Sequence, residues 1–144
     1  MKKKNYATIA KKSAEIQINE LKKIKKVFNN SFNKAIDLIL KCKGKVIFAG
    51  IGKSGLIARK ISATFSSVGI PSFFCDPAQA LHGDMGQIEK KDILIVFSYS
   101  GNTSELNNML KYANRFQIKI IGVASKPGSI LLKASDIKLI LPKV

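Results

Sequence analysis

The sequence predicts an α/β fold: a three-layer sandwich in which helices cover both faces of a five-stranded parallel sheet, preceded by two N-terminal helices. Short apolar runs of strand length alternate with segments whose apolar residues recur every three or four positions, as on one face of a helix. A chain of 144 residues with 46% hydrophobic content can bury one ordinary core. Strands that alternate with helices form parallel sheets through right-handed crossovers.

The N-terminal part of the chain is predicted to form two helices. Over residues 7–28, apolar residues recur at helical spacing between charged ones, which indicates an amphipathic helix. Polar residues 29–31 interrupt it, and a second helix over residues 32–40 follows. We assign residues 1–43 to these helices, packed on the domain or on a partner, and residues 44–144 to one structural unit.

Five apolar runs are predicted to be the strands of the sheet. They are residues 45–50, 70–75, 92–97, 118–124 and 137–141. Helical spacing follows over residues 53–68 and 106–113, with a short helix over 129–134. Residues 76–91 are too polar and too rich in Gly and Pro for regular structure, and long loops of this kind are often functional. We expect these strands in a flavodoxin-like order.

The loop after the first strand is built to approach an anion. Gly50, Gly52 and Gly55 carry no Cβ, so the backbone can come close to a ligand. The amides around Lys53 and Ser54 open the next helix and can point at a phosphate.

The loop after the third strand carries several hydroxyl groups. Ser98, Ser100 and Thr103 can converge with helix N-terminal amides on one phosphate, because Gly101 permits a tight turn. The alternative is an ordinary helix cap, with Asn102 or Thr103 as the capping residue. The glycine loop after the first strand favours phosphate binding, since both loops follow strands of one parallel sheet.

A dinucleotide site is a further alternative for the first loop. Its glycines match the GxGxxG pattern, and Asp76 lies near the end of the next strand. That interpretation leaves the hydroxyl loop unexplained and puts Lys53 where close backbone contact is wanted. The Walker pattern also fails, because no glycine precedes Gly52 at the required spacing. A phosphorylated small molecule that spans both loops explains more residues.

Composition argues against several other classes of protein. The formal charge of +16 comes from scattered lysines, with only Arg59 and Arg115 for base recognition and no interleaved aromatic residues. We expect a solvated basic surface that gathers anionic metabolites, with no specific nucleic-acid partner. Cys42 and Cys75 lack metal-ligand spacing and are predicted to be free thiols. No apolar run is long enough for a bilayer and no secretory signal is apparent, so we expect a cytoplasmic protein without membrane contact.

Three motifs in order resemble the sugar isomerase (SIS) domain and, more narrowly, the D-arabinose 5-phosphate isomerases of the KpsF/GutQ family. They are GIGKSG from Gly50, PSFFCDPAQALHGDMG from Pro71 and FSYSGNTSEL from Phe97. The resemblance covers nearly the whole chain. It implies a homo-oligomer, dimer or tetramer, that binds a sugar phosphate and needs neither cofactor nor metal. It also implies interconversion of D-ribulose 5-phosphate and D-arabinose 5-phosphate through an enediol, for the 3-deoxy-D-manno-octulosonate (KDO) of lipopolysaccharide or capsule.

The resemblance assigns roles to residues of both loops. The phosphate-binding residues are expected to be Gly52, Ser54, Ser98, Ser100, Gly101 and Thr103. Lys53 is expected to stabilise the oxyanion or the anionic substrate, and Glu105 or His82 to move the proton. Asp84 is placed in sequence to orient His82.

The chain also departs from the family pattern. Asn102 stands where Glu is frequent, and Asp76 where His is common before the proline. Family members continue past the position of Val144, often into CBS domains, so we expect a truncated chain. A noncatalytic phosphosugar-binding module is therefore the alternative function.

Overall fold

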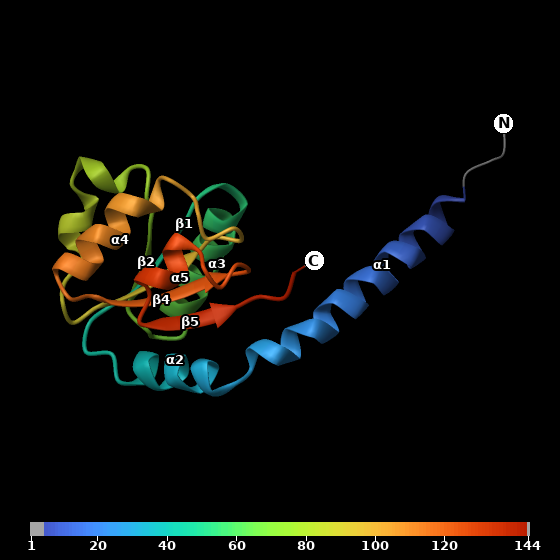
Figure 1. Ribbon diagram of the computed structural model, residues 1–144, viewed down its shortest axis with the longest axis horizontal. Coiled ribbons are helices and arrows are strands. Elements are labelled where there is room, and N and C mark those ends of the chain that lie inside the picture. The colour runs from blue at the N-terminus through green and yellow to red at the C-terminus, as the bar shows by residue number, and fades with distance from the viewer. Residues whose placement is uncertain (1–4, 144) are drawn as a thin grey trace.

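The computed structural model of this protein describes residues 5–143 and confirms the predicted α/β fold with an all-parallel sheet (Figure 1). Residues 1–4 and 144, at the ends of the predicted segments 1–43 and 44–144, lie outside the described residues. The strands are β1 Val46–Gly50, β2 Ser72–Cys75, β3 Ile93–Phe97, β4 Lys119–Ala124 and β5 Ile137–Ile140. Their order is β2-β1-β3-β4-β5, the flavodoxin-like order that we expected.

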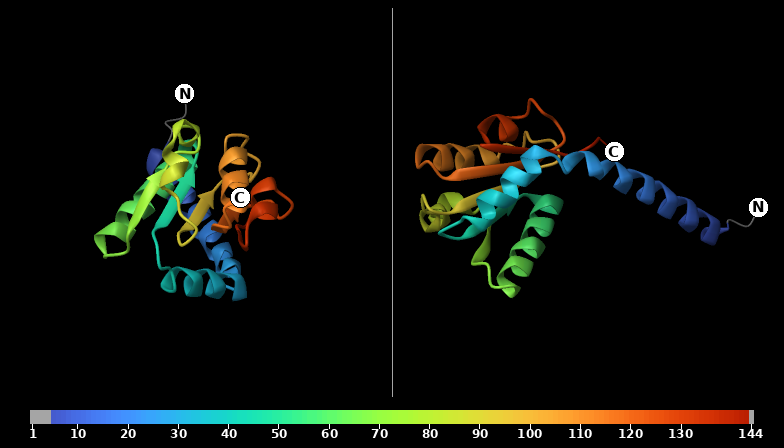
Figure 2. Two further views of the ribbon diagram at one scale, coloured as in Figure 1. Left: turned by 90° about the vertical axis from the view of Figure 1, so that its left-hand side faces the viewer. Right: turned by 90° about the horizontal axis from the view of Figure 1, so that it is seen from below.

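The helices form two layers around this sheet (Figure 2). They are α2 Asn30–Leu40, α3 Gly52–Ser67, α4 Leu106–Arg115 and α5 Ile130–Ala134, whereas α1 Tyr6–Lys23, which leads into the 3-10 turn η1 Ile24–Val27, lies outside both layers. Alternate residues of a strand point to opposite faces, so each strand contributes to both layers. Val46 and Phe48 of β1 pack with α2 and α3 on one face. Ile47 and Ala49 pack with α4 and α5 on the other.

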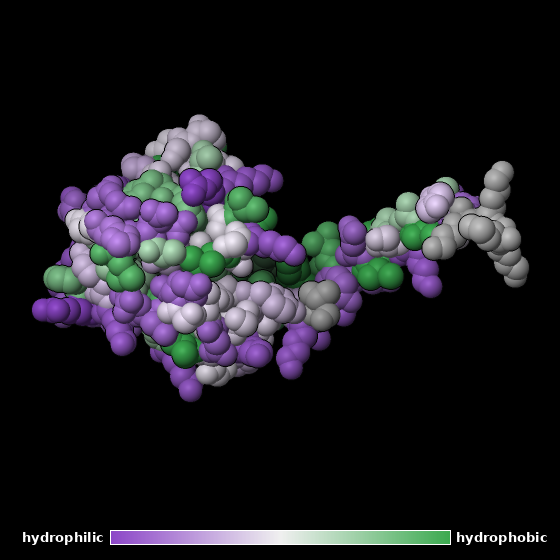
Figure 3. Space-filling model, turned by 90° about the horizontal axis from the view of Figure 1, so that it is seen from above, coloured by the Kyte–Doolittle hydropathy of each residue, from purple (hydrophilic) through white to green (hydrophobic). Residues whose placement is uncertain are grey.

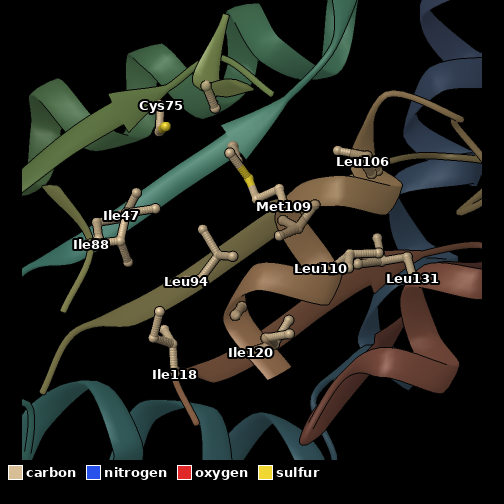
Figure 4. Packing of buried hydrophobic residues seen from close by; sticks show 14 of the residues in the cluster. Ile47, Cys75, Ile88, Leu94, Leu106, Met109, Leu110, Ile118, Ile120 and Leu131 are labelled. Atoms are coloured by element: carbon tan, nitrogen blue, oxygen red, sulfur yellow. The ribbon is translucent and has the colours of Figure 1, made fainter. Parts of the chain in front are cut away.

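The layer under α4 and α5 forms the larger cluster of fully buried side chains (Figure 4). Leu94 of β3 and Ile120 of β4 have no exposed surface, and Met109 of α4 is 1% exposed. Each such side chain contributes about 1.5–3 kcal/mol by leaving water. This packing fixes where α4 begins, and with it the end of the loop that precedes α4.

The long connection after β2 contains short 3-10 turns, which corrects the prediction of no regular structure over residues 76–91. The turns are η2 Ala80–His82 and η3 Asp84–Gln87. Ala80 and Ile88 are buried in the cluster beside α4 and anchor the segment at both ends. The sequence pattern hid this, because two apolar anchors in a polar stretch show no helical period.

A buried carboxylate ties the starts of β1 and β3 together. Asp92 accepts hydrogen bonds from the backbone N–H of Lys45 (2.7 Å) and of Glu89 (2.8 Å), and the Lys45 ammonium lies 3.5 Å away. Its side chain has no exposed surface, so these partners replace the water it loses. A Cβ on Gly44 would collide with the Asp92 carboxylate, so glycine is required at this position.

α1 extends away from the rest of the molecule (Figures 1 and 2). None of its residues is buried, and Ile9, Ile16 and Leu21 are each more than half exposed. Figure 3 shows hydrophobic and hydrophilic surface side by side along this arm. α2, by contrast, packs against β5. No helix within residues 5–143 combines the length and the apolar character that a bilayer crossing requires.

Candidate functional site

The two predicted loops leave adjacent strands at the same edge of the sheet. Gly50 at the end of β1 pairs in register with Phe97 at the end of β3. The chain then turns to opposite faces, because α3 covers one face and α4 the other. This is the point where the strand order reverses, and α/β proteins bind ligands in the crevice that forms there.

The first loop presents backbone N–H groups at the start of α3. Ile51 is the cap residue and makes no side-chain cap hydrogen bond. Within the described part of the chain, no group accepts a hydrogen bond from the N–H of Gly52, Lys53 or Ser54. A Cβ on Gly55 would lie 2.6 Å from the carbonyl oxygen of Gly50, so only glycine lets the helix start this close to the strand. Such a helix start favours an anion.

The second loop gathers two of its three predicted hydroxyls. The Ser98 and Thr103 hydroxyl oxygens are 2.8 Å apart, and the N–H of Gly101 donates to the Ser98 oxygen at 3.0 Å. Gly101 has φ +67°, a conformation that favours glycine. The third hydroxyl, on Ser100, accepts from the N–H of Asn102 at 3.3 Å.

An ordinary cap for α4 does not account for this loop. α4 begins at Leu106, and its cap residue Glu105 makes no side-chain cap hydrogen bond. Asn102 serves a different helix, because its side-chain oxygen accepts from the N–H of Ile130 at the start of α5 (3.0 Å). The loop hydroxyls therefore bond within the loop itself, and the Asn102 side chain ties the loop to the start of α5.

A cavity of about 180 Å³ lies between the two loops and brings Ser54 and Ser98 to one space. Its walls come from both loops and from the ends of β4 and β5: Ser54, Ile57, Phe97, Ser98, Tyr99, Val123 and Leu141. Gly52 and Lys53 are exposed on the adjoining turn. The cavity wall is mostly apolar, and the Ser54 and Ser98 hydroxyls on it together with the adjoining exposed turn suit a small ligand with a charged group.

Larger hollows lie elsewhere, among them one of about 210 Å³ between the end of α2 and the start of β2. One of about 360 Å³ sits at the amino ends of the strands, beside Lys90, Lys119 and Asp136. Another of about 380 Å³ is an apolar groove between α1 and the C-terminal segment, and it shares Tyr99 and Leu141 with the cavity between the loops. We place the site between the loops because the hollow there joins the second loop to the start of α3, whose first N–H groups have no acceptor within residues 5–143.

The three predicted catalytic residues come from different elements: Lys53 from α3, His82 from η2 and Glu105 from the residue directly before α4. Within residues 5–143, no hydrogen bond or ion pair joins any two of Lys53, His82 and Glu105. His82 ends η2, which packs beside α4. Within the described residues Asp84 makes no hydrogen bond or ion pair with His82; its carboxylate accepts instead from the Gln87 amide at 3.2 Å. The described residues also contain no group of three or more His, Cys, Asp or Glu that could hold a metal ion.

Glu105 is exposed and carries a charge at neutral pH. Its own backbone N–H and the Ser104 hydroxyl, 2.8 Å from the carboxylate, hold the pKa of that carboxyl below its ordinary value. An ionised carboxylate directly after the hydroxyl loop can accept a proton from a bound substrate, provided the substrate reaches it.

Sequence reasoning missed Ser125. Its N–H and its hydroxyl both donate to the carbonyl oxygen of Tyr99, at 2.9 and 2.7 Å. A signal was present, because Ser125 directly follows β4 at the edge where Ser98 follows β3. The rule that singled out the loop after β3 would have found it.

Comparison with protein families gives a match to the SIS domain over residues 39–144. The "Probable arabinose 5-phosphate isomerase" of Haemophilus influenzae is 43% identical over 132 residues, which are 92% of this chain and 39% of that protein. "Arabinose 5-phosphate isomerase KdsD" of Francisella tularensis is 42% identical over 127 residues, 86% of this chain and 39% of that protein. The chain thus spans about two fifths of the length of these relatives.

Solved structures show the same fold. Escherichia coli CFT073 c3406, determined in complex with arabinose 5-phosphate, superposes with a TM-score of 0.85 at 35% identity, over 98% of this chain and 77% of that one. Vibrio vulnificus NanR "complexed with ManNAc-6P" has a TM-score of 0.82 at 17% identity, over 94% of this chain and 51% of that one. The NanR similarity shows the fold alone.

Proposed function

Because the chain belongs to the SIS domain family, and within it to the family of the arabinose 5-phosphate isomerases KdsD and GutQ, we propose that it isomerises a five-carbon sugar phosphate. The reaction is the interconversion of D-ribulose 5-phosphate and D-arabinose 5-phosphate through an enediol. Its product would serve synthesis of the KDO sugar of lipopolysaccharide or capsule.

One observation carries this proposal: a single cavity is lined by Ser98 of the second loop and by Ser54 at the start of α3, where the first N–H groups have no acceptor within residues 5–143. A phosphate seated there would accept from the amides of residues 52–54 and from the hydroxyls of Ser98, Ser100 and Thr103. The start of a helix adds about 0.3–2 kcal/mol for an anion, and each hydrogen bond to a charged group about 1.5–3 kcal/mol. The phosphate would fix the sugar with its carbonyl end pointing out of the loop.

The chemistry moves one proton between neighbouring carbons. A base removes the proton from the carbon beside the carbonyl and the enediolate forms. The former carbonyl oxygen then gains a proton, the neighbouring hydroxyl loses one, and the base returns its proton to the former carbonyl carbon, so that carbonyl and hydroxyl change places. Glu105 is our first choice for the base, since its carboxylate is ionised and directly follows the loop. His82 is the second choice. Lys53, exposed at the start of α3, would stabilise the negative oxygen of the enediolate.

A noncatalytic phosphosugar-binding module is the second candidate. It is favoured because binding needs only the two loops, whereas within residues 5–143 no hydrogen bond or ion pair joins any two of Lys53, His82 and Glu105. The two candidates share the phosphate site and differ in turnover.

We also propose that the protein self-associates through α1. Its apolar residues lie in water in a single chain, and a second copy of the chain would cover them. A dimer or a tetramer would satisfy this equally well.

Titration with D-arabinose 5-phosphate tests the phosphate site. Ser100→Ala should raise the dissociation constant about 13- to 160-fold, the equivalent of one hydrogen bond to a charged group. Ser67→Ala is the matched control, because the Ser67 hydroxyl is exposed at the far end of α3 and bonds only within that helix. Equal affinities of Ser100→Ala and wild type would show that the second loop is not part of the phosphate site.

A further inference from the structure

The phosphate loop, residues 98–103, is held from outside by β4 and α5. The N–H of Ser98 donates to the carbonyl oxygen of Val123 at 3.1 Å. Farther along, the N–H of Leu131 donates to the carbonyl oxygen of Gly101 at 2.9 Å. The loop therefore depends on the crossover that follows it, as well as on the strand that delivers it.

Ser125 makes the strongest of these attachments. Both of its donors, the N–H at 2.9 Å and the hydroxyl at 2.7 Å, point at the single carbonyl oxygen of Tyr99. Ser125 is only 5% exposed, so the two hydrogen bonds form out of competition with water. A carbonyl held by two fixed donors cannot rotate freely about its backbone bonds.

The Tyr99 peptide sits between two of the residues that would contact phosphate. Its carbonyl is part of the peptide that leads to Ser100, and its N–H belongs to the peptide that leaves Ser98. The direction of the Tyr99 carbonyl therefore fixes the peptide plane from which Ser100 leaves the backbone, and it restrains the turn that begins at Ser98. Tyr99 also lines the cavity between the loops.

We propose that Ser125 is a positioning residue for the phosphate loop, which it aligns through the Tyr99 carbonyl without touching the ligand. The inference rests on the proposed phosphate site. Without the Ser125 hydroxyl, the hydrogen bond from the Ser125 N–H to the Tyr99 carbonyl oxygen remains. The loop therefore keeps its backbone path, but the direction of the Tyr99 carbonyl is less firmly fixed. The expected consequence is weaker binding of the phosphate group, whatever sugar carries it.

Ser135 offers a matched control within the same chain. It is 7% exposed, and its hydroxyl donates to the carbonyl oxygen of Leu131 at 2.7 Å, the same distance as in the Ser125 bond. The Ser135 bond runs from the C-cap of α5 back to Leu131 in the same helix, so it makes no direct contact with residues 98–103, which Leu131 holds through its own N–H. Ser125→Ala and Ser135→Ala thus remove the same kind of buried hydrogen bond at two different places.

The experiment compares wild type, Ser125→Ala and Ser135→Ala in urea unfolding and in titrations with D-arabinose 5-phosphate and with inorganic phosphate. Both variants should lose similar stability. Ser125→Ala alone should bind both ligands about 2- to 13-fold more weakly, by the same factor for each, since both ligands share the phosphate. Ser125→Cys keeps the volume with a poor donor and replaces Ser125→Ala if that variant is too unstable.

The outcomes separate this inference from the proposed function. Wild-type protein that binds neither ligand overturns the phosphate site and the positioning role with it. Wild-type protein that binds, together with equal affinities of the Ser125 and Ser135 variants, overturns the positioning role alone. A loss confined to the sugar phosphate, with unchanged binding of inorganic phosphate, also contradicts alignment of the phosphate loop.

Discussion

Gly101 is the residue whose substitution tests the geometry of the phosphate loop most sharply. Its φ of +67° costs an alanine about 1–2 kcal/mol. A Cβ at this position would also collide with the Ser129 side chain and lie 3.1 Å from the Ala124 Cβ. Crowding of this kind in a packed interior adds about 1–3 kcal/mol. Gly101→Ala should therefore destabilise the protein by about 2–5 kcal/mol.

Gly52 provides the control, because it has nearly the same backbone conformation without the crowding. Its φ is +57°, and a Cβ there would meet nothing within 4 Å. Both substitutions remove the same freedom from the unfolded chain, so that contribution cancels in the comparison. Gly52→Ala should cost about 1–2 kcal/mol. The difference between the two variants, about 1–3 kcal/mol, isolates the contact between the loop and Ser129.

Urea unfolding followed by circular dichroism measures both variants. With a slope of about 2 kcal/mol per molar urea, a 2 kcal/mol difference displaces the midpoint by about 1 M. Equal midpoints for Gly101→Ala and Gly52→Ala would refute the reasoning, since they would mean that the loop does not press against α5 as the structure shows.

Three further predictions concern other parts of the molecule. Burial, with smaller contributions from the Asp84 and Asp76 carboxylates, raises the pKa of the Cys75 thiol to about 11. In a Cys42→Ser variant, iodoacetamide at pH 8 should therefore modify Cys75 only after unfolding, and rapid labelling of the folded protein would contradict this. For Asp136, burial opposes the charge, but the Ile120 N–H and the Lys119 ammonium outweigh it and lower the pKa. Because the folded-state pKa lies below the unfolded value of about 3.9, the stabilisation is complete above that value and is lost as the pH falls through the folded pKa. Asp136→Asn should unfold more easily than wild type at pH 7, with a difference that shrinks below about pH 4; a difference that persists unchanged in acid would count against it. Finally, wild type should sediment as a dimer or larger at micromolar concentration and Ile9→Asp/Leu21→Asp as a monomer, whereas a monomeric wild type would mean that α1 has no partner copy.

Much of the fold could be predicted from sequence because periodicity records burial directly. Val46, Phe48 and their neighbours form a continuous apolar run, since β1 is covered on both faces. The same pattern predicts where the site lies, because Gly50 ends β1 and Ser98 directly follows β3, and the carboxyl ends of parallel strands meet at one edge. The structure places Ser54 and Ser98 on one cavity, in line with that reasoning.

Other features depend on contacts between residues far apart in sequence. Ala80 and Ile88 anchor the 76–91 connection only because α4 supplies the surface they pack on. Asp92 looks like the polar edge of a strand in the sequence, and its burial becomes intelligible only beside Lys45. Whether His82 can approach the phosphate loop is likewise a question of tertiary and quaternary placement, which no local spacing encodes.

The most direct test of the proposed isomerase is solvent exchange into the bound sugar, followed by NMR in deuterated water. Wild-type protein given D-arabinose 5-phosphate should form D-ribulose 5-phosphate and incorporate deuterium at the carbon beside the carbonyl. Glu105→Gln should slow this about 10²- to 10⁴-fold while its affinity for the sugar phosphate changes little, because the carboxylate acts mainly as the C–H bond breaks. Wild-type protein that binds D-arabinose 5-phosphate yet incorporates no deuterium would contradict the isomerase and leave the phosphosugar-binding module.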